Sequence, residues 1–259
     1  MLIAINGRKQ SGKDVVGKII EYLTGESTVY PFDLKLDYSY RSNWQIKKFA
    51  DKLKDIICIL IGCTREQLED ESFKSKELGE EWWYWYMERD GGYSPIILDY
   101  LTTTKKELKS YEGLELIKPT PRFLLQFIGT NLFRNQLHPE IWVNALMSEY
   151  KLYKETKPFV NLTLKDEEYP NWLITDMRFP NEMEAVKKRG GITIRVNRPC
   201  DICGGSGYHK MSCPVSKSGE HESETILDSA AFDFVIDNNK DIEHLVKEVK
   251  KILKKLNII

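Results

Sequence analysis

The residues best suited to chemistry stand near the start of the chain. Gly7, Gly12 and Lys13 match the pattern G-x-x-x-x-G-K, which also encloses Ser11. In such a loop the backbone N–H groups converge on phosphate oxygens, and Lys13 is placed to reach the β- and γ-phosphates of a nucleotide. The simpler alternative is a glycine turn that only joins two structural elements.

Asp14 follows the loop lysine, at the position where Ser or Thr usually binds Mg²⁺. An unpaired carboxylate beside a triphosphate would repel it electrostatically. We therefore expect Asp14 to lie next to Mg²⁺ or next to a basic partner.

A second candidate site is the segment that contains Asp176 and Arg178, directly after an apolar run. Ligands of doubly wound sheets bind at the carboxyl ends of the strands. There Asp176 could bind Mg²⁺, directly or through water, and Arg178 could bind phosphate with two hydrogen bonds. The alternative is a structural Asp–Arg pair at a turn that begins a helix.

Four polar residues, Arg122, Gln126, Thr130 and Arg134, recur every fourth position in another segment. They would share one side of a helix, without acidic partners four residues away. This pattern fits either a binding surface or an ordinary solvated helix face.

Three cysteines and a histidine lie close together at Cys200, Cys203, His209 and Cys213. Their spacing, among several glycines, suits a structural tetrahedral Zn²⁺ site. Three reduced thiols in a glycine-rich loop are the alternative.

The elements that must position these residues alternate between strand and helix. We predict buried strands at 2–6, 172–175, 192–196 and 232–236. We predict helices at 13–23, from 46 to near 62, and at 120–134, 139–147, 181–189 and 241–256. This alternation indicates an α/β fold with a mostly parallel sheet covered on both faces. The charged segment 65–118, with the aromatic cluster Trp82–Tyr86, is expected to be an insertion outside that sheet, where packing and base stacking are both open to the aromatic residues.

Composition narrows the class of protein. The chain has 259 residues, 41% of them hydrophobic and 30% charged, with a formal net charge of −1. This near-neutral balance gives no electrostatic argument for binding nucleic acid or an anionic membrane. No apolar run is long enough to span a bilayer, and five cysteines, an odd number, fit a reducing compartment, so a cytoplasmic protein is expected.

Taken in order, several segments resemble the phage-type deoxynucleoside monophosphate kinases, a branch of the P-loop nucleotide kinases. The matching segments are 7–14, 49–54, 122–130, 176–182, 221–224 and 235–238. Asp14 after the loop lysine also resembles this family. The family pattern continues with Thr where this chain has Val15.

The resemblance implies a single P-loop domain, residues 1–259, with a three-layer fold. It implies an inserted monophosphate-binding region at about 45–150 and a lid over ATP at about 198–222. The four soft ligands fall in that lid, and some adenylate kinases are similar in having a zinc-bound lid. A structural Zn²⁺ is therefore expected here.

The activity implied is transfer of the ATP γ-phosphoryl group to a deoxynucleoside monophosphate, with Mg²⁺. The expected catalytic residues are Lys13, Asp14, Asp176 and Arg178. The expected ATP-binding residues are Gly7, Ser11, Gly12, Lys13, Asp14 and Asn238. The expected substrate-binding residues are Lys52, Arg122, Gln126, Arg134, Asp176, Arg178, Asn181 and Glu182. Arg195 or Arg198, at the base of the lid, could stabilise charge on the transferring group.

Two other functions stay open at this point. One is a P-loop kinase with a hydroxyl acceptor, such as a dephospho-coenzyme A kinase or a shikimate-type kinase. The other is a non-catalytic module that binds nucleotide or nucleic acid, against which the near-zero net charge argues. The sequence does not choose between monomer and homodimer, and the base of the substrate is likewise open.

Overall fold

The computed structural model describes residues 1–25, 31–39, 42–88, 95–152, 169–199 and 225–259. The chain divides into two compact units. The first consists of residues 1–50 and 142–259, and the second of residues 51–141. Each unit is described by itself below.

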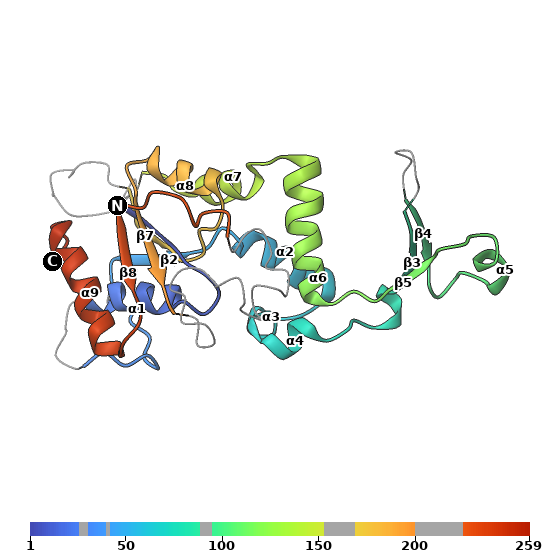
Figure 1. Ribbon diagram of the computed structural model, residues 1–259, viewed down its shortest axis with the longest axis horizontal. Helices are drawn as coiled ribbons and strands as arrows, with labels where there is room; N and C mark the ends of the chain where they lie inside the picture. Colours follow the sequence, from blue (N-terminus) through green and yellow to red (C-terminus); the bar gives the residue numbers. More distant parts are fainter. Residues whose placement is uncertain (26–30, 40–41, 89–94, 153–168, 200–224) are drawn as a thin grey trace, which may run out of the picture. The chain divides into compact units, whose positions relative to one another are not determined.

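The first unit is built on a five-stranded sheet with the order β2-β6-β1-β7-β8, in which every neighbouring pair is parallel (Figure 1). Its strands are β1 (Leu2–Asn6), β2 (Trp44–Lys47), β6 (Asn171–Ile174), β7 (Ile192–Asn197) and β8 (Phe234–Asp237). The central strand β1 is buried along its whole length. A continuous apolar run is what a parallel strand needs when helices cover both faces of the sheet.

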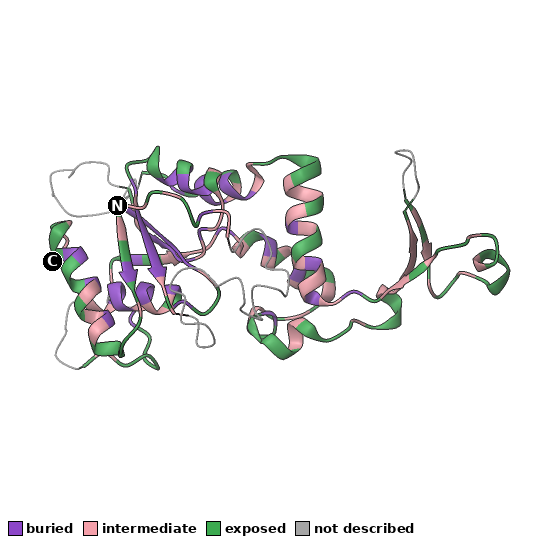
Figure 2. Ribbon diagram, in the orientation of Figure 1, coloured by how far each residue is buried: buried purple, intermediate pink, exposed green. Residues whose placement is uncertain are grey.

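Helices cover the two faces of this sheet. They are α1 (Lys13–Thr24) and α9 (Ile242–Lys255) on one face, and α7 (Ile141–Met147) and α8 (Pro180–Lys187) on the other. Alternate residues of β1 face the two sides of the sheet: Ile3 and Ile5 pack with α1 and α9, whereas Leu2 and Ala4 pack with α7 and α8. Figure 2 shows buried residues, in purple, along strands of this sheet. The three-layer α/β fold of the P-loop type is confirmed.

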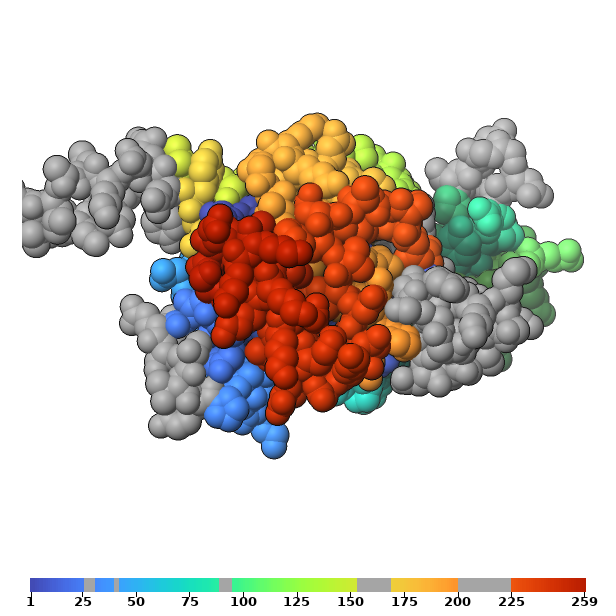
Figure 3. Space-filling model, turned by 60° about the vertical axis from the view of Figure 1, so that its left-hand side comes forward, coloured from blue at the N-terminus to red at the C-terminus, as the bar shows by residue number. Residues whose placement is uncertain are grey.

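The last helix illustrates how local sequence and packing agree. Asp241 accepts a hydrogen bond from the backbone N–H of His244 over 2.8 Å and so caps α9. Leu245, Val249, Ile252 and Leu253 form the buried stripe of the helix. α9 packs beside α1. Residues 225–259, which include β8 and α9, form the red surface in Figure 3.

One predicted boundary is wrong. The helix expected from Ile46 begins instead at Asp51, as α2 (Asp51–Ile61), and Ile46 belongs to strand β2. Trp44–Lys47 pairs with β6, with Ile46 opposite Leu173. The long-range pairing therefore overrides the helical spacing of apolar residues in this segment.

The second unit contains short helices and a separate sheet. Its helical segments are α2, α3 (Arg65–Glu69), α4 (Glu71–Ser75), η2 (Glu80–Trp82), α5 (Lys105–Leu108), α6 (Pro121–Gln126) and η3 (Phe127–Leu137). The strands β3 (Tyr84–Met87), β4 (Ile96–Asp99) and β5 (Glu115–Ile117) form an antiparallel sheet with the order β4-β3-β5. As predicted for the insertion 65–118, its described residues do not contribute to the parallel sheet. Trp83 and Trp85 both contact the ring of Tyr100.

The helix predicted to begin at Thr120 and Pro121 is present. Thr120 caps α6 by accepting a hydrogen bond from the N–H of Phe123 over 3.1 Å, and Pro121 occupies the first turn. From Phe127 the helix continues as the wider π-helical stretch η3. Wide turns of this kind are uncommon and often lie at functional sites.

Candidate functional site

The glycine loop at 7–12 joins β1 to α1, as the sequence predicts. Gly12 adopts φ +99°, a conformation that side chains rarely allow, and a Cβ atom there would lie 2.6 Å from Asn238 Nδ2. No side chain caps the start of α1. The first backbone N–H groups of the helix and its positive end are therefore oriented towards the loop, where an anion can bind.

Hydrogen bonds fix the shape of this loop. Ser11 N–H donates to Arg8 O over 3.1 Å, and Lys13 Nζ donates to the same carbonyl over 2.7 Å. Asn238 Nδ2, at the end of β8, donates to Ser11 O over 2.9 Å. The hydroxyl of Ser11 is buried and has no hydrogen-bond partner among the residues that the structure describes. The loop thus fits a phosphate group, and binding of ATP remains a prediction.

Asp14 has the basic partner that the sequence requires of it. Its Oδ1 accepts a hydrogen bond from Thr175 Oγ1 over 2.9 Å and lies 3.0 Å from Lys48 Nζ. Desolvation by its neighbours opposes ionisation, but the charge and hydrogen bond of Lys48, with the Thr175 hydroxyl and the charge of Lys13, lower the pKa of the largely exposed Asp14 overall. An ionised carboxylate beside the loop suits Mg²⁺, which prefers oxygen ligands.

Asp176 lies beyond the end of β6, at the position that the sequence predicts. Its Oδ1 accepts the N–H of Phe49 over 2.8 Å and its Oδ2 accepts the N–H of Ala50 over 3.0 Å. Burial of the carboxyl raises its pKa, which the two N–H bonds and the charges of Arg178 and Lys48 oppose. Asp176 therefore fixes the backbone after β2, while a role for it in binding Mg²⁺ remains a prediction.

The turn after Asp176 is organised by Glu182. This carboxylate, in a residue only 2% exposed, accepts the N–H groups of Arg178 over 2.7 Å and Phe179 over 3.1 Å. Asn181 Oδ1 accepts the N–H of Glu182 over 3.0 Å. In this structure Glu182 and Asn181 shape the start of α8. Their roles in substrate binding, and that of the half-buried Arg178, remain predictions.

An ionic cluster beside the loop was not foreseen in the sequence. Asp228 Oδ2 pairs with Arg8 Nη2 over 2.5 Å, and its Oδ1 pairs with Arg195 Nη2 over 2.6 Å. Arg195 is buried and also donates to the side-chain oxygens of Asn6 and Asn197. Arg195 thus connects β1, β7 and the segment before β8. Arg198 is exposed, with its Nη1 3.5 Å from Gln10 O. Of the two candidates for stabilising the transferring group, Arg198 is therefore more accessible to a ligand than the buried Arg195.

Lys48, Thr175 and Asp228 are the polar residues of this site that sequence reasoning missed. A faint signal existed for two of them. Thr175 is the last residue before Asp176, and Lys48 precedes the matching segment 49–54. Asp228 gave no signal, because its two arginine partners are distant in the sequence.

The second unit carries the other predicted substrate residues. Arg122 and Gln126 lie on α6, Arg134 lies on η3 and the exposed Lys52 lies on α2. Arg122 Nη2 pairs with Glu71 Oε2 of α4 over 2.6 Å, an acidic partner that its own helix does not offer. Their roles in binding an acceptor phosphate stay predictions.

The predicted zinc ligands Cys200, Cys203, His209 and Cys213 lie outside the described residues, as does most of the predicted lid at 198–222. Within the described ranges, no group of three or more His, Cys, Asp or Glu side chains could bind a metal ion together. This finding leaves the zinc prediction untested.

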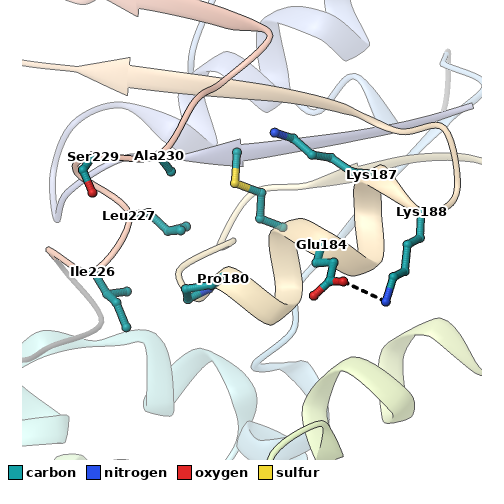
Figure 4. A pocket seen from close by; sticks show the side chains of 9 residues that line it. Pro180, Glu184, Lys187, Lys188, Ile226, Leu227, Ser229 and Ala230 are labelled. Carbon is teal, nitrogen blue, oxygen red and sulfur yellow. Dashed lines mark ion pairs between the residues drawn. The ribbon is translucent and has the colours of Figure 1, made fainter.

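An open surface pocket of about 450 Å³ lies between α8 and residues 226–230 (Figure 4). Apolar side chains such as Pro180 and Leu227 line it, and Glu184 pairs with Lys188 at its edge over 2.8 Å. None of the predicted site residues lines this pocket. The candidate site is therefore the glycine loop and its surroundings rather than this hollow.

Comparison with known proteins adds two viral relatives. A protein of Acanthamoeba polyphaga mimivirus, provisionally described as a deoxynucleotide monophosphate kinase, is 29% identical over 134 residues, which is 50% of this chain and 59% of the mimiviral protein. The deoxynucleoside-5'-monophosphate kinase of Escherichia phage T5 is 26% identical over 208 residues, which is 73% of this chain and 72% of the phage protein. The resemblance to viral deoxynucleoside monophosphate kinases is confirmed. No family model matches the chain.

The match to the phage enzyme covers 73% of this chain, so the likeness does not rest on the short glycine loop alone. None of the helices in the described ranges is long and apolar enough to cross a membrane.

Proposed function

We propose that this chain transfers the γ-phosphoryl group of ATP to a deoxynucleoside monophosphate and produces ADP and a deoxynucleoside diphosphate. The observation that carries the proposal is the glycine loop at the uncapped start of α1, with Lys13 inside it and Asp14 beside it. The two viral relatives, named as kinases of this type, supply the acceptor class.

In the proposed reaction, an oxygen of the acceptor phosphate attacks the γ-phosphorus of ATP while the bond from that phosphorus to the β-phosphate oxygen breaks. The acceptor is already ionised, so no strong general base is needed, and positioning and charge neutralisation account for the catalysis. The loop N–H groups and Lys13 bind the ATP phosphates. Asn238 supports this loop through the carbonyl of Ser11.

Mg²⁺, when bound with ATP, neutralises charge that develops on the phosphates. Asp14 is the residue of this chain whose exposed carboxylate fits the ion. Asp176 is proposed to help organise Mg²⁺, directly or through water, while it fixes the backbone after β2. Arg178 is proposed to bind the acceptor phosphate. Binding of phosphate is likewise proposed for Arg122 and Arg134, which belong to the second unit. Gln126, Asn181 and Lys52 are proposed to contact the rest of the substrate.

The proposal includes a Zn²⁺ bound by Cys200, Cys203, His209 and Cys213 as a structural element of the lid. That metal would take no part in the transfer, since four protein ligands leave no open position. Because both relatives are viral, we further propose that the protein acts in the cytoplasm of an infected cell.

A coupled assay of ADP formation tests this function, with ATP, Mg²⁺ and each deoxy- and ribonucleoside monophosphate in turn. We expect turnover with one or a few deoxynucleotides and little ADP without an acceptor. Absence of acceptor-dependent ADP across the whole panel would contradict the proposal. It would point to an acceptor with a hydroxyl group or to binding without catalysis.

Two variants link the turnover to the glycine loop. Lys13→Met should lower kcat at least about 100-fold, because the side chain that neutralises the β- and γ-phosphates is lost. Lys18→Met is the matched control, since this lysine lies on the same helix and donates to Leu34 O, away from the loop. Turnover that survives in Lys13→Met would exclude this loop as the ATP site.

A further inference from the structure

The start of α1 lacks the hydroxyl that a phosphate-binding loop of this kind usually supplies. Asp14 occupies the position of the usual Ser or Thr, and Val15 follows it. A carboxylate on a surface helix can adopt several rotamers, so its direction must be set by neighbours if it is to bind a cation at one place.

In the folded protein, a hydroxyl from the residue directly after β6 lies beside Asp14. Thr175 is 1% exposed, and its Oγ1 donates to Asp14 Oδ1 over 2.9 Å. The two residues are 161 positions apart in the chain. The contact is therefore a product of the fold and not of the loop sequence.

The Thr175 side chain has little freedom to turn away from Asp14. Its methyl group faces Gly17, one helical turn after Asp14, so closely that a Cβ atom on Gly17 would lie 2.9 Å from Thr175 Cγ2. Thr is branched at Cβ, so a fixed methyl also fixes the hydroxyl. Gly17 thus orients Thr175, and Thr175 in turn orients Asp14.

Lys48 adds a second restraint on the same oxygen. Its Nζ lies 3.0 Å from Asp14 Oδ1, the same oxygen that accepts the hydrogen bond of the Thr175 hydroxyl. The Asp14 side chain nevertheless remains 65% exposed. A carboxylate that is bound through one oxygen and still accessible is suited to bind a cation from the solvent side.

We infer that Thr175 is a positioning residue that directs the Asp14 carboxylate towards the divalent cation of bound ATP. The inference rests on the proposed function, because it assigns a residue to the Mg²⁺ that such a kinase uses. Thr175 would not touch the cation itself. Its hydroxyl would fix the orientation of the Asp14 carboxylate, as hydrogen-bond donors around metal sites commonly do for carboxylate ligands.

The test measures ATP affinity by titration calorimetry, with Mg²⁺ and again with EDTA. The ratio of the two affinities is the magnesium gain. Thr175→Val keeps the branched shape and the methyl against Gly17 but removes the hydroxyl. We expect its magnesium gain to fall about tenfold, the scale of one hydrogen bond to a charged group, with ATP affinity in EDTA changed less than about twofold.

Two further variants separate orientation from packing. Thr175→Ser keeps the hydroxyl and loses the methyl, and it should retain most of the magnesium gain. Gly17→Ala keeps Thr175 but forces its methyl to shift, so the gain should fall although alanine favours the helix. Thermal unfolding is measured for each variant as well. It identifies any variant whose magnesium gain falls only because the protein is unfolded.

The outcomes distinguish this inference from the proposed function. A wild-type magnesium gain in Thr175→Val, or an equal loss in Thr175→Val and Thr175→Ser, would overturn the role of Thr175 while the kinase assignment stands. If the wild-type protein bound ATP in neither condition, the proposed function itself would fail, and the inference with it.

Discussion

Asn238 donates a hydrogen bond from its side-chain Nδ2 to the carbonyl oxygen of Ser11 over 2.9 Å. Asn238 stands directly after β8, an edge strand of the sheet, whereas Ser11 lies inside the glycine loop beside the central strand. The bond thus connects the loop to a strand that is not its neighbour. It also explains why Gly12 must be glycine, since Nδ2 occupies the space that a Cβ atom would need.

From this bond we predict that Asn238 affects the affinity for ATP and not the affinity for the acceptor. In Asn238→Ala the carbonyl of Ser11 loses its partner and the loop loosens, so ATP affinity should fall about fivefold, for a loss of about 1 kcal/mol. Titration calorimetry measures it. Asn239→Ala, a change at the exposed neighbouring asparagine, is the matched control and should leave the affinity unchanged. Equal losses in both variants would contradict a specific role for Asn238.

Asp176→Asn tests whether this residue acts mainly on the backbone. The amide nitrogen cannot accept a hydrogen bond, so either Phe49 N–H or Ala50 N–H would face another donor. We expect a loss of about 1–3 kcal/mol in the free energy of unfolding, measured by urea denaturation. The magnesium gain in ATP affinity should change less than in Asp14→Asn. The reverse order would assign direct cation binding to Asp176.

Glu21 predicts a pH-dependent stability. Burial, with the charge of Asp37, raises the pKa of Glu21 to about 7 from an ordinary value of 4.5, while Lys18 opposes the shift. The folded state therefore binds this proton more tightly than the unfolded state. Stability from this group is complete below about pH 4.5 and is lost as the pH rises through 7.

Glu21→Gln removes this titration. The variant should be more stable than the wild type by about 2–3 kcal/mol at pH 8, and the difference should vanish near pH 4. Urea denaturation at several pH values checks this. The exposed Glu243→Gln serves as the control and should show no such crossover. If the two proteins differed in free energy of unfolding by the same amount at all pH values, titration of the buried Glu21 carboxyl would be ruled out as the cause of that difference.

The predicted zinc ligands Cys200, Cys203, His209 and Cys213 imply that the purified protein contains zinc. Elemental analysis of the purified protein should find about one zinc per chain, and Cys203→Ser should lower that content because a four-ligand site loses one ligand. Cys58→Ser, which changes a cysteine in α2, is the control. Protein that is free of zinc, yet fully active, would leave these residues as reduced thiols.

The sequence by itself determined the elements whose signals are local. The glycine loop between β1 and α1, the periodic helix at 241–256 and the Thr120–Pro121 helix start were all predicted from neighbouring residues. Hydrophobic periodicity and capping act within a few residues, so they can be read without knowledge of the fold. The order of the matching segments was also enough to indicate the family that the two viral relatives represent.

Only the tertiary structure decided which side chains meet at the loop. Strand β2 was missed because its extended form depends on pairing with β6, and this pairing places Lys48 beside Asp14. Thr175 and Asp228 reach their partners in the same way, through strands that are adjacent in the sheet but distant in the chain. Sheet pairing is a long-range interaction, and the polar contacts at the strand ends follow from it.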